Sequence, residues 1–168
     1  PLDNIGVDFY WLDNENKDKT KELWYMVNLH YQKTNSNNKR GIVLSRNHMI
    51  NSHKYPILYS GKTIVSWDTL KNLPFYNSSA TNMGISYWAH DIGGFYKGTE
   101  DNELYTRFVQ FGVFSPILKF GSAGGKYYKR EPWKWSMKTY SIVKDYLNLR
   151  HQLIPYIYAE AYKYHTYG

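Results

Sequence analysis

The sequence predicts an α/β fold built around a parallel sheet, and three observations support this prediction. Segments typical of strands alternate five times with segments typical of helices, which is the order of βα units. The predicted strands are nearly continuous apolar runs, as expected for parallel strands covered on both faces. Charged residues or glycines follow the strands, at the edge where βα barrels carry their functional groups. Because a full eight-stranded barrel takes about 250 residues, the 168 residues of this chain predict a partial (β/α)8 TIM barrel of about five βα units, with no internal domain boundary.

The individual elements follow from local composition. Strands are expected at residues 5–12, 41–45, 55–59, 84–90 and 113–120, where β-branched and aromatic residues gather. Helices are expected over residues 19–33, from Ser66, from Thr99 and over residues 136–164. Ser66 is a predicted N-cap with Asp68 in the first turn, and Thr99 precedes acidic residues in the same way. Pro155 is expected to kink or divide the last helical region.

Composition excludes several classes of protein. The chain has no cysteine, which excludes disulfides and thiolate zinc sites, and its 42% of hydrophobic residues excludes a disordered chain. No apolar run approaches the roughly 20 residues of a membrane span, and no signal peptide opens the chain, so the expected location is the cytoplasm. The chain lacks a dinucleotide-binding glycine motif and a P-loop, and its histidines lack metal-ligand spacing. We therefore expect no cofactor, no metal and no membrane association.

The charge leaves one minor alternative open. A formal net charge of +7 with 18% aromatic residues also suits a nucleic-acid-binding module, which neutralises phosphates and stacks on bases. The lysines are spread along the chain, however, and no nucleic-acid-binding motif accompanies them. We therefore expect no nucleic-acid partner.

The residues that follow the predicted strands indicate a sugar pocket. They are Asp13, Arg46, Gly61 with Lys62, His90 with Asp91, and Gly121. Trp11 and Trp88 lie just ahead of two of them. Aromatic rings stack on the apolar faces of pyranoses, while charged groups bind sugar hydroxyls. The alternative is that Asp13 and Asp91 only cap the following loops or pair with Arg46.

Seven motifs in order along the chain extend this interpretation. They are Val7–Asp13, Leu44–Arg46, Tyr59–Gly61, Trp88–Phe95, Gln110–Pro116, Arg130–Trp133 and Leu149–Tyr156. Together they resemble glycoside hydrolase family 31, the α-glucosidase and α-xylosidase family. The resemblance implies strands four to eight of a catalytic barrel within a larger multidomain chain, with a carbohydrate substrate. The remaining domains of that chain, or further copies of it, are the expected protein partners. Because five strands alone expose sheet edges and an apolar face, the isolated segment is expected to self-associate and to be inactive.

The resemblance also implies roles for the residues at the strand ends. Asp13 falls on the nucleophile position of a retaining mechanism, in which a second carboxylic acid protonates the leaving oxygen. The implied substrate-binding residues are Trp11, Arg46, Trp88, His90 and Asp91.

Two positions depart from the pattern of the family. Lys62 stands where the resemblance places the acid/base aspartate, and Gly121 stands where it places a sugar-binding histidine. A lysine ammonium with an ordinary pKa of about 10.4 is a poor proton donor at neutral pH. Three explanations stay open. The acid comes from Glu15, Asp68 or a loop outside this segment; Lys62 and Arg46 accommodate an anionic sugar; or the protein has lost hydrolysis and kept carbohydrate binding.

Overall fold

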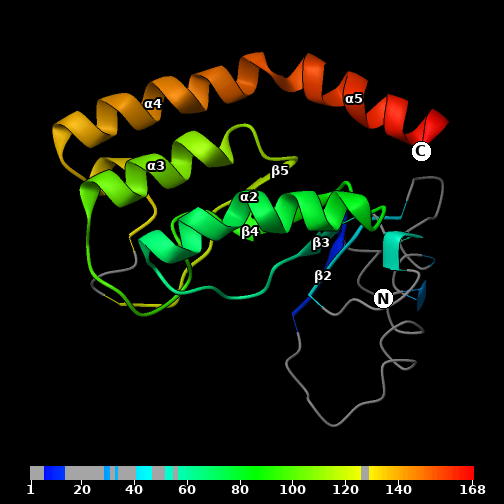
Figure 1. Cartoon of the computed structure of the whole chain (residues 1–168), viewed down its shortest axis with the longest axis horizontal. Coiled ribbons are helices and arrows are strands. Elements are labelled where there is room, and N and C mark those ends of the chain that lie inside the picture. Colours follow the sequence, from blue (N-terminus) through cyan, green and yellow to red (C-terminus); the bar gives the residue numbers. More distant parts are fainter. Residues whose placement is uncertain are drawn as a thin grey trace, which may run out of the picture.

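The computed structural model describes residues 6–13, 29–30, 33, 41–46, 52–54, 57–125 and 129–168. Its strands are Tyr10–Leu12 (β1), Val43–Ser45 (β2), Ile57–Tyr59 (β3), Trp88–Asp91 (β4) and Ile117–Lys119 (β5). Its α-helices are Trp67–Asn82 (α2), Asn102–Gly112 (α3), Met137–Gln152 (α4) and Ile154–Tyr167 (α5), and two 3₁₀ helices span Ser52–Lys54 (η2) and Pro132–Lys134 (η3). Figure 1 shows α2 and α3 beside the sheet, with α4 and α5 running along the outside.

The described strands form one parallel sheet in the order β1-β2-β3-β4-β5. This confirms the predicted parallel α/β architecture with five strands. The strands are shorter than predicted: of residues 6–12 only Tyr10–Leu12 are in β1, and of residues 113–120 only Ile117–Lys119 are in β5. Residues 113–116 instead form the turn after α3, where the Ser115 N–H donates to the Gly112 carbonyl at 3.0 Å. Apolar composition alone does not separate a strand from a buried turn.

The starts of two helices test the predicted caps. Ser66 caps α2 as predicted, since its Oγ accepts the backbone N–H of Thr69 at 3.1 Å. The prediction for α3 was wrong by two residues, because Asp101 and not Thr99 is the N-cap. Oδ1 of Asp101 accepts the N–H groups of Glu103 at 2.8 Å and of the following residue at 3.1 Å. Asp101 takes this role because it stands directly before the first turn with an extended backbone.

Pro155 divides the last helical region, as predicted. Helix α4 ends at Gln152, Leu153 separates the two helices, and Pro155 lies in the first turn of α5, where its missing N–H is not needed. The predicted helix over residues 19–33 lies largely outside the described residues, although Leu29, His30 and Lys33 are helical. Within the described ranges, none of the helices has the length and apolar character needed to cross a membrane.

The sheet is buried on two sides, as parallel strands require. On the outer face, toward the helices, Leu58 and Trp88 pack with Ala80 of α2 and with Ile85. A larger buried cluster between sheet and helices contains Val65, Leu73, Ile92, Leu104, Tyr105, Phe108, Val109, Val113 and Val143. The opposite, inner face carries a separate cluster of Leu44, Tyr59, Ala89, Ile57 and Ile117. This inner cluster forms an apolar floor below the carboxyl ends of the strands.

Candidate active site

The inner face of the sheet assembles the candidate site at the carboxyl ends of the strands. Residues two apart along a strand share a face of the sheet. The strand residues on the inner face are Trp11 of β1, Tyr59 of β3, Asp91 of β4 and Lys119 of β5. The residues that follow the strands on the same face are Asp13 after β1, Arg46 after β2, Gly61 after β3 and Gly121 after β5. Contacts among these residues connect all five described strands. The structure therefore brings together most of the predicted strand-end residues.

Asp13 lies at the centre of this group. The Tyr59 hydroxyl donates a 2.6 Å hydrogen bond to Oδ1 of Asp13, and Nη1 of Arg46 lies 4.0 Å from the same oxygen. Nζ of Lys62 lies 3.6 Å from the other oxygen, Oδ2, and the Asp13 side chain is 24% exposed. Burial and the hydrogen bond to Asp13 raise the pKa of Tyr59 above its usual value, so the phenol remains a donor. Oδ1 is thus held in place by Tyr59, while Oδ2 lies beside the Lys62 ammonium.

Gly61 allows Arg46 and Lys62 to approach Asp13 together. Its φ of +83° lies in the left-handed region that favours glycine. A Cβ atom at this position would lie 2.9 Å from Nε of Arg46. Glycine therefore leaves room for the guanidinium group against the backbone while the chain turns to present Lys62.

Asp91 and Lys119 form a buried ion pair beside this centre. Asp91 is 1% exposed, and Nζ of Lys119 donates to its Oδ1. Desolvation raises the pKa of Asp91, while the lysine opposes this shift. The Lys119 ammonium also lies 4.6 Å from the centroid of the Trp11 ring and 5.0 Å from that of the Tyr59 ring. Lys119 therefore joins the Asp91 side of the site to the Asp13 side.

Gly121 stands against this ion pair. A Cβ atom on Gly121 would lie 2.6 Å from Oδ1 of Asp91 and 3.0 Å from Nζ of Lys119. Gly121 also lines a hollow of about 430 Å³. The other described residues that line the hollow are Phe120, Ser122, Ala123, Gly124, Gly125, Lys129, Arg130, Glu131 and Lys134. Gly121, which has no side chain, thus lies between the Asp91–Lys119 ion pair and a hollow lined by basic residues.

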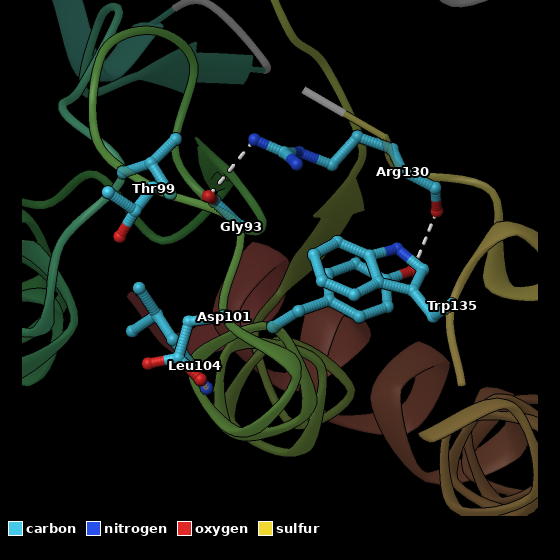
Figure 2. A pocket seen from close by; sticks show the side chains of 8 residues that line it. Gly93, Thr99, Asp101, Leu104, Arg130 and Trp135 are labelled. Carbon is cyan, nitrogen blue, oxygen red and sulfur yellow. Dashed lines mark hydrogen bonds between the residues drawn. The ribbon is translucent and has the colours of Figure 1, made fainter. Parts of the chain in front are cut away.

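Arg130 holds the turn that follows Asp91. Its Nη2 donates to the carbonyl oxygens of Gly93 at 3.0 Å and Gly94 at 2.5 Å, and Figure 2 shows the guanidinium directed at Gly93. The carbonyl of Arg130 accepts the Tyr105 hydroxyl at 2.6 Å, and the Tyr105 ring stacks on Trp135 with centroids 4.3 Å apart. These contacts fix the backbone just after β4 and so help to orient Asp91.

Trp88 and His90 lie on the opposite face of β4 from Asp91, which corrects their expected place in the pocket. Trp88 is 8% exposed and packs in the outer cluster with Leu58. Nε2 of His90 lies 3.1 Å from Oγ of Ser115, and the buried imidazole faces the helices. Burial lowers the pKa of His90 to about 4, so its ring is neutral at pH 7. Because side chains alternate along a strand, residues 88 and 90 share a face that residue 91 does not.

Two site residues were not singled out from the sequence, Tyr59 and Lys119. Each stands two residues before a glycine at a strand end, so the alternation of the strand would have indicated that it shares the inner face. Of the acids considered as alternatives, Asp68 is exposed in the first turn of α2, and Glu15 lies outside the described residues. In the ranges that the structure describes, no group of three or more His, Asp or Glu side chains is arranged to hold a metal ion.

Comparisons with known proteins agree with this architecture. Among curated proteins, an α-xylosidase of Saccharolobus solfataricus is 26% identical over 98% of this chain and 26% of its own length. Alpha-glucosidase 2 of Bacillus thermoamyloliquefaciens is 32% identical over 76% of this chain and 16% of its own length. The solved structure of a cycloalternan-degrading enzyme from Trueperella pyogenes shares the fold, with a TM-score of 0.72 at 22% identity over 79% of this chain and 20% of that one. The chain thus spans about a quarter or less of the length of these relatives.

The family is shown by a match over nearly the whole chain. The family model described as the TIM-barrel domain of glycosyl hydrolases family 31 matches residues 1–160. That span contains every strand of the described sheet and every residue of the candidate site. The chain therefore belongs to glycoside hydrolase family 31 and forms part of its TIM-barrel domain.

Proposed function

We propose that the protein containing this chain hydrolyses α-linked glycosides, with Asp13 as the nucleophile of a retaining mechanism. The setting of Asp13 carries this proposal. Its Oδ1 is anchored by Tyr59, its side chain is 24% exposed, and it follows the carboxyl end of β1, where βα barrels place their chemistry. The relatives named α-xylosidase and α-glucosidase support the hydrolase class.

In this mechanism Oδ2 of Asp13 attacks the anomeric carbon as the bond to the leaving oxygen breaks. Water then cleaves the resulting glycosyl ester, so the configuration of the sugar is retained. We assign the binding of sugar hydroxyls to Arg46, whose Nη1 lies 4.0 Å from Oδ1 of Asp13, and to Asp91, as the family resemblance implies. Asp91 is buried and pairs with Lys119, so this role requires the pair to open or Lys119 to share the contact. The ring of Trp11, which is 48% exposed, supplies an apolar surface for the pyranose.

Lys62 determines which leaving groups are cleaved readily. Its ammonium lies 3.6 Å from Oδ2 of Asp13 and does not supply the carboxylic acid that a retaining mechanism uses. Loss of general acid catalysis costs about 10²- to 10⁴-fold in rate. We therefore expect hydrolysis of aryl α-glycosides, whose phenolate leaves without protonation, and slow hydrolysis of alkyl α-glycosides.

The test is hydrolysis of an aryl α-glucoside and an aryl α-xyloside by the full-length protein. Asp13→Ala should reduce turnover to the uncatalysed background. Asp145→Ala, which removes an exposed carboxylate from α4, is the matched control and should keep the wild-type rate. Wild-type turnover in Asp13→Ala would show that the nucleophile assignment is wrong.

The ion pair between Lys62 and Asp13 also favours a second candidate function, carbohydrate binding without hydrolysis. An ammonium beside the Asp13 carboxylate stabilises its negative charge, and this makes the carboxylate a weaker nucleophile. Saccharide binding measured by calorimetry, together with no turnover of either aryl glycoside, would support this candidate over the first.

The full site is proposed to form in a longer protein. Strands β1 and β5 are the two edges of the described sheet, and the relatives are about four to six times as long as the part that matches. We propose that further strands of the parent chain pair with these edges and complete the barrel around the substrate.

A further inference from the structure

The oxygen that attacks in the proposed mechanism faces a cation. Nζ of Lys62 lies 3.6 Å from Oδ2 of Asp13 and 5.2 Å from the centroid of the Phe95 ring. In retaining sites the group that meets the leaving oxygen lies about 5–5.5 Å from the nucleophile. The Lys62 ammonium lies closer to Asp13 than this, on a flexible four-carbon stem. The leaving oxygen therefore meets a positive charge at the place where an alcohol leaving group needs a proton.

This arrangement suits a leaving group that departs as an anion. An alkoxide is strongly basic and leaves only when an acid protonates it. A diphosphate is weakly basic, leaves without a proton, and is stabilised by charge-assisted hydrogen bonds from an ammonium. Replacing a carboxylic acid by lysine therefore exchanges one class of leaving group for another.

The basic hollow beside Gly121 is linked to Lys62 through Phe95. The N–H of Ala123, in the wall of the hollow, donates to the carbonyl of Phe95 at 2.9 Å, and Lys62 lies over the Phe95 ring. Three cations, Lys129, Arg130 and Lys134, and one carboxylate, Glu131, are among the described residues lining the hollow. Lys129 pairs with Glu100 at 3.0 Å, Lys134 pairs with Glu131 at 2.6 Å, and Arg130 donates to backbone carbonyls, so a bound phosphate would compete with these partners. Its volume of about 430 Å³ is of the size that ligand pockets have.

We propose that the substrate is an α-glycosyl diphosphate, meaning a sugar whose anomeric oxygen belongs to a diphosphate, as in a nucleoside diphosphate sugar. Lys62 pairs with the phosphate that carries the scissile oxygen, and the basic hollow accepts the rest of the leaving group. This inference rests on the proposed role of Asp13 as nucleophile and names the substrate class of the same site.

The reaction balances without an acid. Oδ2 of Asp13 forms a bond to the anomeric carbon, the bond from that carbon to the bridging oxygen breaks, and the electron pair leaves with the terminal phosphate. Asp13 loses its charge on forming the ester, so the Lys62 ammonium no longer pairs with Asp13 and pairs with the departing phosphate instead. Water then attacks the anomeric carbon, the bond to Asp13 breaks, and the terminal phosphate takes the proton that water loses. The products are the free sugar and the nucleoside diphosphate.

The experiment measures the binding and turnover of UDP-glucose and UDP-xylose by the full-length protein. Methyl α-glucoside and methyl α-xyloside are the neutral reference ligands, and UDP alone reports binding of the nucleotide without a sugar. Wild-type protein should bind the matching UDP-sugar at least about 10-fold more tightly than the methyl glycoside, since a hydrogen bond to a charged group contributes about this factor. The methyl glycoside should compete with the UDP-sugar, and UDP should be released in the reaction.

The variants separate the role of Lys62 from general charge. Lys62→Gln should reduce the ratio of the two affinities toward one, and Lys62→Asp should reverse it because two carboxylates would then face the phosphate. Lys71→Gln, which removes an exposed cation from α2, is the matched control and should keep the wild-type ratio.

Two outcomes overturn the proposal: a wild-type ratio near one, or the same ratio in Lys62→Gln as in the wild type. If aryl glycosides are hydrolysed through Asp13 while the ratio is near one, the substrate class is wrong and the proposed hydrolase stands. If the ratio is high and depends on Lys62 while no substrate turns over, hydrolysis is wrong and the selectivity for a diphosphate stands.

Discussion

The hydroxyl of Tyr59 donates to Oδ1 of Asp13 across 2.6 Å and so links β3 to the end of β1, two strands that are not neighbours in the sheet. Adjacent strands lie about 4.8 Å apart, so a long side chain on the inner face is needed to reach past β2. The ring of Tyr59 belongs to the buried inner cluster. One residue therefore couples the apolar floor to the orientation of the proposed nucleophile.

Tyr59→Phe should lower kcat for aryl α-glycosides by about 10-fold, with KM changed less, because it removes a hydrogen bond to a charged group and keeps the ring. Steady-state kinetics give the two parameters separately. Tyr76→Phe, in an exposed residue of α2, is the control and should leave both unchanged. An unchanged kcat in Tyr59→Phe would show that Oδ1 needs no anchor.

Lys62→Asp should increase the turnover of alkyl α-glycosides. The new carboxyl group stands beside Asp13, where it can protonate the leaving oxygen, and general acid catalysis contributes about 10²- to 10⁴-fold. The initial rate with a maltose-type substrate measures the gain. Lys62→Asn has a similar shape without an acid and should show no gain. Equal rates in both variants would contradict the assignment of position 62 to the leaving-group side.

Lys119→Met should destabilise the protein strongly. It leaves the carboxylate of Asp91 buried without its partner, and breaking such a pair costs about 3–5 kcal/mol in the free energy of unfolding. Denaturant unfolding measures the loss. Lys163→Met breaks the exposed pair with Glu160 and should change the free energy of unfolding far less, because solvent screens an exposed pair. Losses of the same size in the two variants would refute the distinction between a buried pair and a surface pair.

His90 should make stability depend on pH below neutrality. Burial lowers the pKa of His90 to about 4 in the folded state, whereas an unfolded histidine has a pKa of about 6.5. Between these values the unfolded chain binds a proton that the folded protein does not. The free energy of unfolding should therefore fall by about 3 kcal/mol as the pH drops from about 6.5 to about 4.

His90→Gln removes this titration and keeps a polar side chain opposite Ser115. The difference in unfolding free energy between wild type and variant should shift by this amount between pH 7 and pH 4. A difference that stays constant across this range would show that His90 is not held neutral by burial.

The order of the elements could be predicted because it depends on local patterns. Ser66 caps α2 and Pro155 divides α4 from α5, since capping and the missing N–H of proline act within one turn. The exact ends of the helices and strands could be predicted less well from the sequence. Asp101 rather than Thr99 caps α3, and the strands extend only as far as their neighbours pair with them. Which of several nearby polar residues caps a helix, and where the pairing of two strands ends, depend on tertiary contacts.

The strand-end residues Asp13, Arg46, Lys62 and Asp91 were identified along the chain because βα topology brings the ends of successive strands to one edge. The pairing of these side chains required the folded structure. Tyr59 contacts Asp13 from 46 positions away, and Lys119 contacts Asp91 from 28 positions away. The local sequence does not indicate such partners, because they come into contact only when the strands pair and alternate residues lie on the inner face of the sheet. The same alternation assigned Trp88 to the packing beneath the helices, where the sequence had predicted a wall of the pocket.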